Sequence, residues 1–561
     1  MKRATFVLAA LLAIATFVRH APAEERDGDG NPLQLVEATV SELQHALRSQ
    51  AVTSERLVQM YLARIAAYDD AGPTLNSFLH VNDAAIDEGR VRDFERRVGR
   101  AHGPLFGIPI LLKDNINTDD MPTTGGSVAL AGSIPPADAF LTQRLRDAGA
   151  IILGKATLTE FANFIAIGMP SGYSSLGGYG LNPYDPRPLP GSDGRPVLTP
   201  GGSSSGPGIA VSANLVTVAI GTETSGSILS PSSSNGVVGI KPTLGLVSRA
   251  GILPITADQD TAGPITRTVT DAATVLGVIA GFDPNDPATL ACLIPGNCHS
   301  DYTRFLDKHA LRRARIAVPR VPFWNGFTPA QQQIMLDAIA ALRAQGAFVA
   351  DPYEIPNQAA LSAFGICTAF PAPANCSTVL MYGQKHDLNN YLAQRPDAPV
   401  HTLGEIIAFN SAHAATALKY GQAIFVAAEH LDTSPGSADT QRYLADRARD
   451  LALARGGLDA VLDGPDGIRG TGDDFDAILF PQNRGAGTPA KAGYPTVVVP
   501  GGFLPPAGDV VQPAPFGMAF TGRAFSEPTL IGLAYAFEQA TQHRRPPASA
   551  PPLATDSVGR P

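Results

Sequence analysis

The sequence has only four cysteines, one tryptophan and 17% charged residues among its 561 positions. So little charge beside 44% apolar residues excludes an intrinsically disordered chain. After the N-terminal stretch, no apolar run is long enough to cross a membrane. The net charge of −9 and the absence of a long basic run exclude a nucleic acid partner. What remains is an acidic globular protein.

The four cysteines form two close pairs along the chain. Cys292 and Cys298 enclose one short turn with a proline, and Cys367 and Cys376 enclose another. Two local disulfides are the simplest of the three possible connectivities. A zinc site is a poor alternative because no histidine stands at a finger-like spacing. The cysteines therefore predict an oxidising environment.

The first 23 residues have the pattern of a secretory signal peptide. Lys2 and Arg3 precede the apolar stretch 4–18, and Ala21-Pro22-Ala23 fits a small-x-small cleavage site. An uncleaved N-terminal anchor is the alternative. We expect export to the periplasm or the medium, with no stable membrane insertion once the signal is removed.

The rest of the chain predicts one α/β domain over residues 24–545. Short apolar runs alternate with helical patterns, as expected for buried strands separated by helices. These runs are 105–112, 151–153, 215–220, 237–240, 316–318, 478–480 and 496–499. We find neither a central linker nor an internal repeat, and residues 546–561 are predicted to be a disordered proline-rich tail. Capping residues at Thr39 and at either Thr53 or Ser54 predict two early helices.

An acidic, glycine-rich segment stands at 463–474, with the sequence DGPDGIRGTGDD. Its closely spaced oxygen ligands make a calcium loop conceivable, but the EF-hand register is missing. We interpret it as a solvated turn.

The chemistry is concentrated in residues 201–227, where two Ser/Gly-rich turns flank the apolar run 215–220. Glycine lets the backbone approach a ligand and present its N–H groups, and serine supplies hydroxyls. Serine nucleophiles and anion holes need these two features together. The alternative for either turn alone is a flexible linker.

Three interpretations of these serines compete. Gly202-Ser-Ser-Ser-Gly206 matches the hydrolase elbow G-x-S-x-G, but it follows a loop with six prolines at 182–200 instead of a strand. A phosphate-binding turn lacks the lysine that it needs after the glycines. The third interpretation begins at Lys113, which ends the apolar run 105–112.

A desolvated lysine loses its proton more easily and can then deprotonate a serine. Such a site needs no histidine, and none of the 11 histidines lies in a Gly/Ser turn. The alternative is that Lys113 is a snorkelling residue or an ion-pair partner of Asp114.

Four motifs in order resemble the amidase signature family over about residues 34–545. They are GIP leading to KDN (107–115), GGSSSG (201–206), GTETSGSI (221–228) and the long run NGVVGIKPTLGLVSRAGILPITADQDTAGPITRTVTD (235–271). The segment IIAFNSAH (406–413) and the Arg-Arg-Pro-Pro run from 544 are most similar to bacterial peptide amidases. The resemblance implies an α/β fold with a large mixed central β-sheet covered by helices on both faces.

The resemblance also implies a Ser–cis-Ser–Lys triad. Ser227 matches the nucleophile, and Lys113 matches the base. Ser203, 24 positions before Ser227, matches the bridging serine, with a cis peptide bond between Gly202 and Ser203. The implied oxyanion-hole N–H groups belong to Thr224, Ser225, Gly226 and Ser227. We expect Ser204, Ser205 and Thr222 to hydrogen-bond around the triad, and the alternative is that they only satisfy the backbone of the turns. Neither a metal nor an organic cofactor is called for.

Three other positions bear on this site. Ser225 stands where relatives often have glycine or aspartate, which concerns substrate preference more than the oxyanion hole. Lys155 and Lys241 also end strands, and we interpret both as structural.

The expected function is that of an exported amide hydrolase that works through a covalent acyl-serine ester. Its substrate is a small amide or a peptide amide, with release of ammonia from C-terminal peptide amides as the leading expectation. An amidase for small aliphatic or aryl amides is the alternative. An inactive binding protein on the same fold fits only if a triad residue is missing, and all three are present. A tRNA-coupled amidotransferase component has no use for export.

Overall fold

The computed structural model describes residues 33–558. The signal-peptide prediction for residues 1–23 lies outside them. Within this range no helix is both long enough and apolar enough to span a bilayer.

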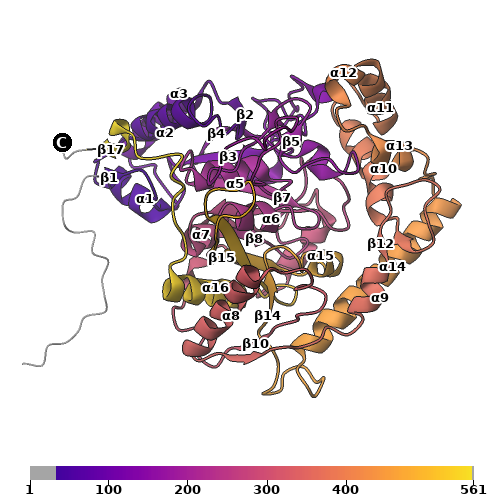
Figure 1. Cartoon of the computed structure of the whole chain (residues 1–561). Coiled ribbons are helices and arrows are strands. Elements are labelled where there is room, and N and C mark those ends of the chain that lie inside the picture. The colour runs from indigo at the N-terminus through magenta and orange to yellow at the C-terminus, as the bar shows by residue number, and fades with distance from the viewer. Residues whose placement is uncertain (1–32, 559–561) are drawn as a thin grey trace, which may run out of the picture.

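An 11-stranded sheet forms the centre of the molecule (Figure 1). Its order is β11 (Phe348–Ala350), β10 (Arg315–Ala317), β14 (Ala477–Pro481), β16 (Ala514–Thr521), β15 (Thr496–Leu504), β8 (Val238–Lys241), β9 (Thr261–Thr266), β7 (Val218–Glu223), β3 (Pro109–Lys113), β4 (Ile151–Ala156) and β2 (Phe78–Val81). Parallel pairs occur at β11–β10–β14 and at β7–β3–β4, and the other neighbours are antiparallel. The implied large mixed sheet is confirmed.

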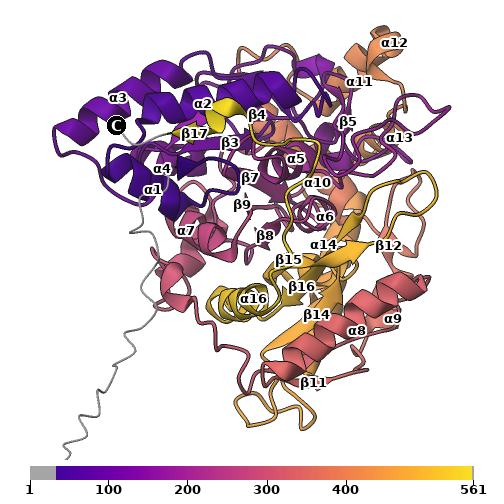
Figure 2. The same ribbon diagram turned by 60° about the vertical axis from the view of Figure 1, so that its left-hand side comes forward.

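Helices cover both faces of this sheet, as the resemblance implied (Figures 1 and 2). The first group consists of α5 (Ser205–Ser212) and α6 (Leu229–Ser234), which contact each other and the sheet. The second consists of α4 (Phe140–Asp147), α7 (Val269–Ile279), α16 (Glu527–Thr541) and α8 (Pro329–Ala344), each in contact with the next. Helix α3 (Ala85–Arg97) contacts β4 and α2 (Ser54–Tyr68), and α1 (Val40–Arg48) lies on the same side of the molecule (Figure 2). Thr39 and Thr53 cap α1 and α2 as predicted.

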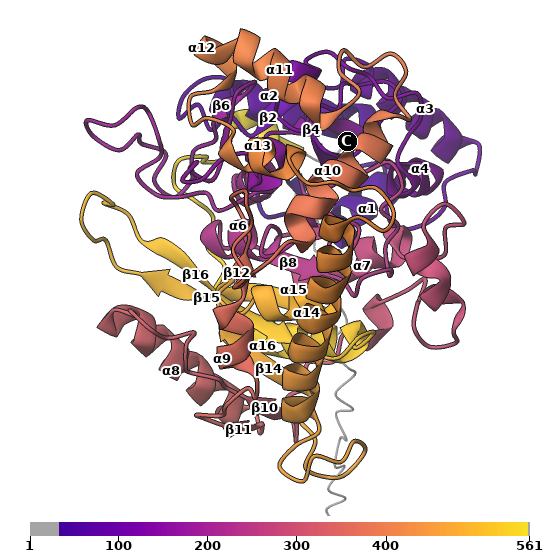
Figure 3. The same ribbon diagram turned by 90° about the vertical axis from the view of Figure 1, so that its right-hand side faces the viewer.

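A further helical group, formed by residues 358–462, lies along one side of the sheet (Figure 3). It consists of α9 (Gln358–Ala363), α10 (Val379–Leu392), α11 (Leu403–Ala412), α12 (Ala414–Ala417), α13 (Ala423–Glu429) and the long α14 (Ala438–Leu462), which contacts α15 (Gly487–Ala492). Helices α10, α11 and α13 share a separate apolar core with the loop after β4. This arrangement places α10 opposite the ends of β3 and β7.

Both predicted disulfides are present. Cys292 is bonded to Cys298, and Cys367 is bonded to Cys376, so the local connectivity is confirmed. The second bridge joins the ends of the turn between the short parallel strands β12 (Gly365–Ile366) and β13 (Cys376–Ser377).

The predicted disordered tail is wrong for residues 546–558, which pack against the domain. Strand β17 (Ser557–Val558) pairs with β1 (Leu33–Gln34). The buried guanidinium of Arg64 bonds to Asp556 at 2.5 Å and to the carbonyl oxygen of Ala550 at 3.0 Å. Proline prevents regular structure here, but its neighbours' carbonyls still accept hydrogen bonds from a distant arginine.

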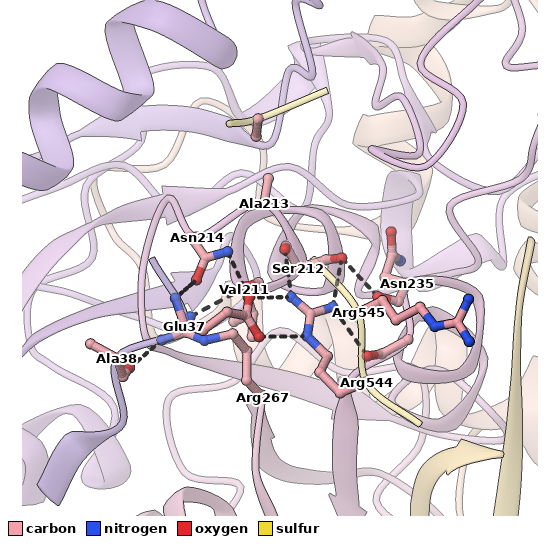
Figure 4. Close-up of polar contacts among 12 residues, drawn as sticks. Glu37, Ala38, Val211, Ser212, Ala213, Asn214, Asn235, Arg267, Arg544 and Arg545 are labelled. Atoms are coloured by element: carbon pink, nitrogen blue, oxygen red, sulfur yellow. Dashed lines mark hydrogen bonds and ion pairs between the residues drawn. The ribbon is translucent and has the colours of Figure 1, made fainter. Parts of the chain in front are cut away.

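The tail begins with an anchored arginine. Arg544 pairs with Glu37 at 2.9 Å and donates to the carbonyl oxygen of Ser212 at 2.8 Å, at the end of α5 (Figure 4). The pKa of Glu37 is lowered because the attraction of Arg544 and Arg267 outweighs its burial. The C-terminal segment thus contacts the helix that begins just after Ser203.

The acidic segment 463–474 is a turn in which Asp463 pairs with Arg523 and the other carboxylates bond mainly to the turn itself. Asp466 accepts the N–H of Ile468 at 2.8 Å, and Asp474 accepts that of Gly470 at 2.8 Å. Within residues 33–558, no group of three or more His, Cys, Asp or Glu side chains is placed to hold a metal ion.

Candidate active site

Lys113 is the last residue of β3, a strand buried along its whole length between β7 and β4. Its side chain is fully buried. The ammonium nitrogen Nζ donates to Ser203 Oγ at 2.9 Å, to Thr222 Oγ1 at 2.8 Å and to the carbonyl oxygen of Thr222 at 3.3 Å. The strand therefore delivers a lysine to a serine of the first Ser/Gly-rich turn.

Burial lowers the pKa of Lys113 from 10.5 to about 7, although the carboxylates of Asp260 and Glu223 oppose the shift. Desolvation disfavours the charged ammonium, and none of its hydrogen-bond acceptors is a carboxylate. Near neutral pH, a substantial fraction of Lys113 is a neutral amine. Such an amine can accept a proton from Ser203.

Ser203 follows a cis peptide bond to Gly202, as the resemblance implied. A Cβ atom at Gly202 would lie 2.5 Å from Thr159 Oγ1, so only glycine fits here. The carbonyl oxygen of Ser203 accepts the N–H of Thr159 at 3.0 Å. The turn is therefore held from both sides, and the Ser203 hydroxyl is directed at Lys113.

Ser227 lies in the turn that follows β7. Glu223, the last residue of β7, accepts the N–H groups of Ile228 at 2.7 Å and Leu229 at 3.0 Å, which folds the turn back on the strand. Gly226 has φ = 93°, a conformation that favours glycine. Ser227 is buried, with 8% of the residue exposed.

The two turns are joined through the backbone. The N–H of Ser204 donates to the carbonyl oxygen of Ser227 at 3.1 Å. Within residues 33–558 the hydroxyls of Ser203 and Ser227 are not hydrogen-bonded to each other, so the structure joins Lys113 to Ser203 directly and brings Ser227 beside them. In the same range the N–H groups of Ser225 and Ser227 donate to no protein group, which leaves them available to an oxyanion.

The predicted neighbours differ in their roles. Ser204 Oγ donates to the carbonyl oxygen of Thr222 at 3.0 Å and accepts the Thr222 N–H at 3.2 Å. Thr222 Oγ1 in turn accepts from Lys113. Ser205 is different: its buried hydroxyl has no hydrogen-bond partner among the described residues.

Sequence reasoning missed two polar residues that contact this site. Asn115, two positions after Lys113, donates from Nδ2 to Thr222 Oγ1 at 3.0 Å. Asp260 accepts the hydroxyl of Thr224 at 2.5 Å and the N–H groups of Ile255 and Thr256 at 2.8 and 2.9 Å. Both lie within the resemblance motifs, but their contacts are made across the fold and leave no local signal.

Two cavities flank the turn 224–227. The first, of about 770 Å³, is lined by Thr222 and Thr224, by Asn115 and by residues of α10. The second, of about 460 Å³, reaches Ser225, and its surface is more apolar than polar. Its apolar side chains are those of Pro322, Phe323, Leu361, Phe364, Ile366 and Leu380.

A family model described as Amidase matches residues 56–432. Among solved structures, the peptide amidase from Stenotrophomonas maltophilia is similar, with 42% identity and a TM-score of 0.80. The match covers 92% of this chain and 99% of that one. The implied resemblance and fold are therefore confirmed.

Two curated relatives extend the comparison. A probable amidase of Arabidopsis thaliana is 37% identical over 522 residues, which is 91% of each chain. One component of a glutamyl-tRNA(Gln) amidotransferase of Chloroflexus aurantiacus is 33% identical over 525 residues, covering 91% of this chain and 98% of that relative.

Proposed function

This chain belongs to the amidase family and is an amide hydrolase; from that premise we propose that it is exported and releases ammonia from C-terminal peptide amides through an acyl ester on Ser227. The observation that carries the catalytic part is the hydrogen bond between Lys113 Nζ and Ser203 Oγ, 2.9 Å long and fully buried. It joins a base with a lowered pKa to a hydroxyl beside the proposed nucleophile.

In the first half of the proposed reaction, neutral Lys113 accepts the proton of Ser203, and Ser203 accepts the proton of Ser227. The Ser227 oxygen forms a bond to the amide carbon, and the carbonyl π electrons move onto oxygen. The free backbone N–H groups of Ser225 and Ser227 stabilise this oxyanion. The Ser203–Ser227 contact closes when substrate occupies the site, since catalytic hydrogen bonds tighten in the complex.

In the second half the oxyanion collapses and the carbon–nitrogen bond breaks. Ser203 gives its proton to the leaving nitrogen and regains one from Lys113, so ammonia departs and Lys113 is neutral again. Water then attacks the ester by the same route, and Ser227 recovers its proton when the carboxylic acid leaves. Every proton taken from Ser227 or from water is returned within one cycle.

Three observations support the substrate part of this proposal. The similar solved structure is a peptide amidase. Two cavities meet at the turn 224–227, which suits a substrate that extends on more than one side of the reacting carbonyl. All three triad positions are occupied, which argues against an inactive binding protein. An amidase for small aliphatic or aryl amides remains the second candidate, because the apolar cavity suits such groups.

Export rests on the N-terminal pattern at residues 1–23 and on two disulfides, which persist in oxidising compartments. Export also argues against the role of the tRNA-coupled amidotransferase relative. Cell fractionation with N-terminal sequencing tests it: we expect a mature chain that begins at Glu24 in the periplasm or the medium. Recovery of a chain that begins at Met1 in the cytoplasm would refute it.

The test of activity is ammonia release by residues 24–561 from four substrates: a peptide amide, its N-acylated form, an amino-acid amide and an aryl acylamide. Ser227→Ala is the control, and fluorophosphonate labelling of Ser227 reports the nucleophile independently. We expect turnover of the peptide amides, lost in the variant. Turnover of only the aryl or free amino-acid amides would support the triad but refute the proposed peptide-amide substrate.

A further inference from the structure

We propose that the 770 Å³ cavity binds a positively charged group of the substrate, so that amides with an ammonium or guanidinium group are preferred over neutral and anionic ones. This inference rests on the proposed amidase function and names a substrate class for the same site. It depends on where the cavity lies, on its charges and on two unpartnered oxygen atoms.

The cavity adjoins the reacting groups. Thr222, in its wall, accepts a hydrogen bond from Lys113, and Thr224, also in its wall, begins the turn that carries Ser227. A substrate whose carbonyl reaches Ser227 can therefore extend into this cavity. The opposite wall is formed by α10, through Asp387, Asn390 and Tyr391.

Carboxylates outnumber cations in the lining. The charged lining residues are Asp138, Asp260, Asp286, Asp387, Arg249 and Arg395. Two of the carboxylates are paired with arginines, Asp286 with Arg249 at 2.5 Å and Asp138 with Arg146 at 3.0 Å.

Asp260 and Asp387 have no arginine or lysine within ion-pair distance among the described residues. Asp260 is held by Thr224 and two backbone N–H groups, and Asp387 accepts the N–H of Ala257 at 2.8 Å and bonds to the ring of His386. Arg395 is 2% exposed, and its guanidinium donates to the carbonyl oxygens of Thr123 and Ser133. The negative charges are thus the ones that remain available to a ligand.

Two buried oxygens in the lining lack partners. Asn115 Oδ1 and Thr261 Oγ1 make no hydrogen bond within the described chain, although these residues are only 3% and 1% exposed. The orientation of the Asn115 amide is fixed, since its Nδ2 donates to the carbonyl oxygen of Leu253 at 3.3 Å. Its Oδ1 is therefore an acceptor, and a buried unpartnered acceptor indicates a site for a donor. Ammonium and guanidinium groups bring donors and positive charge together.

The second cavity provides the contrast. Its Asp450 is paired with Lys491 at 3.0 Å, and its third charged residue, Arg484, donates to the carbonyl oxygen of Asn325 at 2.7 Å. The other lining residues are apolar or uncharged, so no free carboxylate faces this cavity. A substrate with one cationic and one apolar substituent matches the two cavities together.

The test uses three peptide amides that differ in one charge: acetyl-Lys-Leu-amide, acetyl-Gln-Leu-amide and acetyl-Glu-Leu-amide. We expect kcat/KM to fall in that order, with roughly a tenfold difference between the first and the last, as for one or two charges in a partly solvated site. Raising the ionic strength from about 0.05 M to about 0.5 M should reduce this ratio.

Asp387→Asn should lower the Lys-to-Glu ratio of kcat/KM about threefold, because it removes one of the two carboxylates available to the cation. The matched control is Asp397→Asn, an exposed aspartate that lies outside the cavity lining. A ratio near one in the unmodified protein, or an equal change in both variants, would overturn the cation preference and leave the amidase function intact.

Binding of the three amides to Ser227→Ala by calorimetry gives the same comparison without turnover. The order Lys, Gln, Glu is expected there too, and equal affinities would refute the proposal. Absence of turnover together with absence of Ser227 labelling would refute the proposed function instead.

Discussion

The ends of the neighbouring strands β3 and β4 each carry a fully buried lysine, and the two differ in their partners. Lys113 bonds to hydroxyl and carbonyl oxygens only. Lys155 bonds to Pro122 O at 2.9 Å and Thr123 Oγ1 at 2.7 Å and also faces the carboxylate of Asp114 at 3.5 Å. Burial lowers the pKa of both, to about 7 for Lys113 and about 8 for Lys155, where Asp114 opposes the shift.

The comparison shows that burial alone does not make a general base. Asp114 is adjacent to Lys113 in the sequence, yet it pairs with Lys155: Asp114 directly follows β3, and side chains alternate between the two faces along an extended chain. The alternative in which Lys113 is the ion-pair partner of Asp114 is therefore wrong. Lys241, at the end of β8, resembles Lys155: the carboxylates of Glu223 and Glu527 oppose the burial that lowers its pKa to about 8.

Lys113→Met is expected to give the largest effect. Without the base, kcat/KM for amide hydrolysis should fall by roughly 10⁴-fold, as for other members of a catalytic triad. The fold should persist, because removing a desolvated amine leaves no unpaired carboxylate behind. Steady-state ammonia release measures the activity, and circular dichroism measures whether the fold persists. More than a tenth of the activity remaining would exclude Lys113 as the base.

Lys155→Met is expected to act on stability. Removing one member of a buried ion pair leaves Asp114 uncompensated and costs about 3–5 kcal/mol of unfolding free energy. The urea midpoint should fall, and the double variant Asp114→Asn/Lys155→Met should recover part of the loss. A midpoint unchanged by Lys155→Met would mean that the pair is not structural.

The pH dependence separates the two lysines further. The neutral form of Lys113 is active, so kcat/KM should rise about tenfold per pH unit below 7 and level off above it. Asp114→Asn should leave this rising part of the pH profile in place, since Lys155 is not the base. If Asp114→Asn shifted the rising part of the kcat/KM profile, the titrating group would be Lys155.

Stability should follow the same pKa with a defined sign. The folded protein holds Lys113 at a pKa of about 7, against 10.5 for an ordinary lysine, so folding disfavours its proton. The resulting destabilisation is complete below pH 7 and is relieved between 7 and 10.5. Lys113→Met should therefore be stabilising below pH 7, and this gain should shrink as the pH rises. Urea midpoints of both proteins between pH 5 and 9 measure the difference.

The features that the sequence predicted are those that local spacing encodes. The cysteine pairs are six and nine positions apart, and the caps of α1 and α2 are contacts within one turn. Seven apolar runs became strands because buried strands read as continuous apolar segments. The position of Lys113 at the end of such a run was therefore visible, while its distance from Ser203 came only from the family resemblance.

The features that were missed depend on distant contacts. Strand β9 reads TAGPIT, with a proline in the middle of a central strand, a composition that argues against strand. The tail is held by Arg64, nearly 500 positions earlier in the chain. Asp260 contacts Thr224 because the two residues lie opposite each other at the ends of the neighbouring strands β9 and β7. No local pattern distinguishes these residues from solvent-exposed ones.

The smallest effect should come from removing one hydroxyl acceptor at each lysine. Thr222→Val takes away an acceptor that stabilises the ammonium form of Lys113, so the pKa should fall further and the rising part of the pH profile should move below 7 by less than one unit. Thr123→Val makes the same change at Lys155 and should leave the rising part where it is. Both are measured by kcat/KM profiles between pH 5 and 9. Equal shifts in the two variants would mean that the apparent pKa of the kcat/KM profile belongs to the buried cluster as a whole. A shift confined to Thr222→Val assigns that pKa to Lys113.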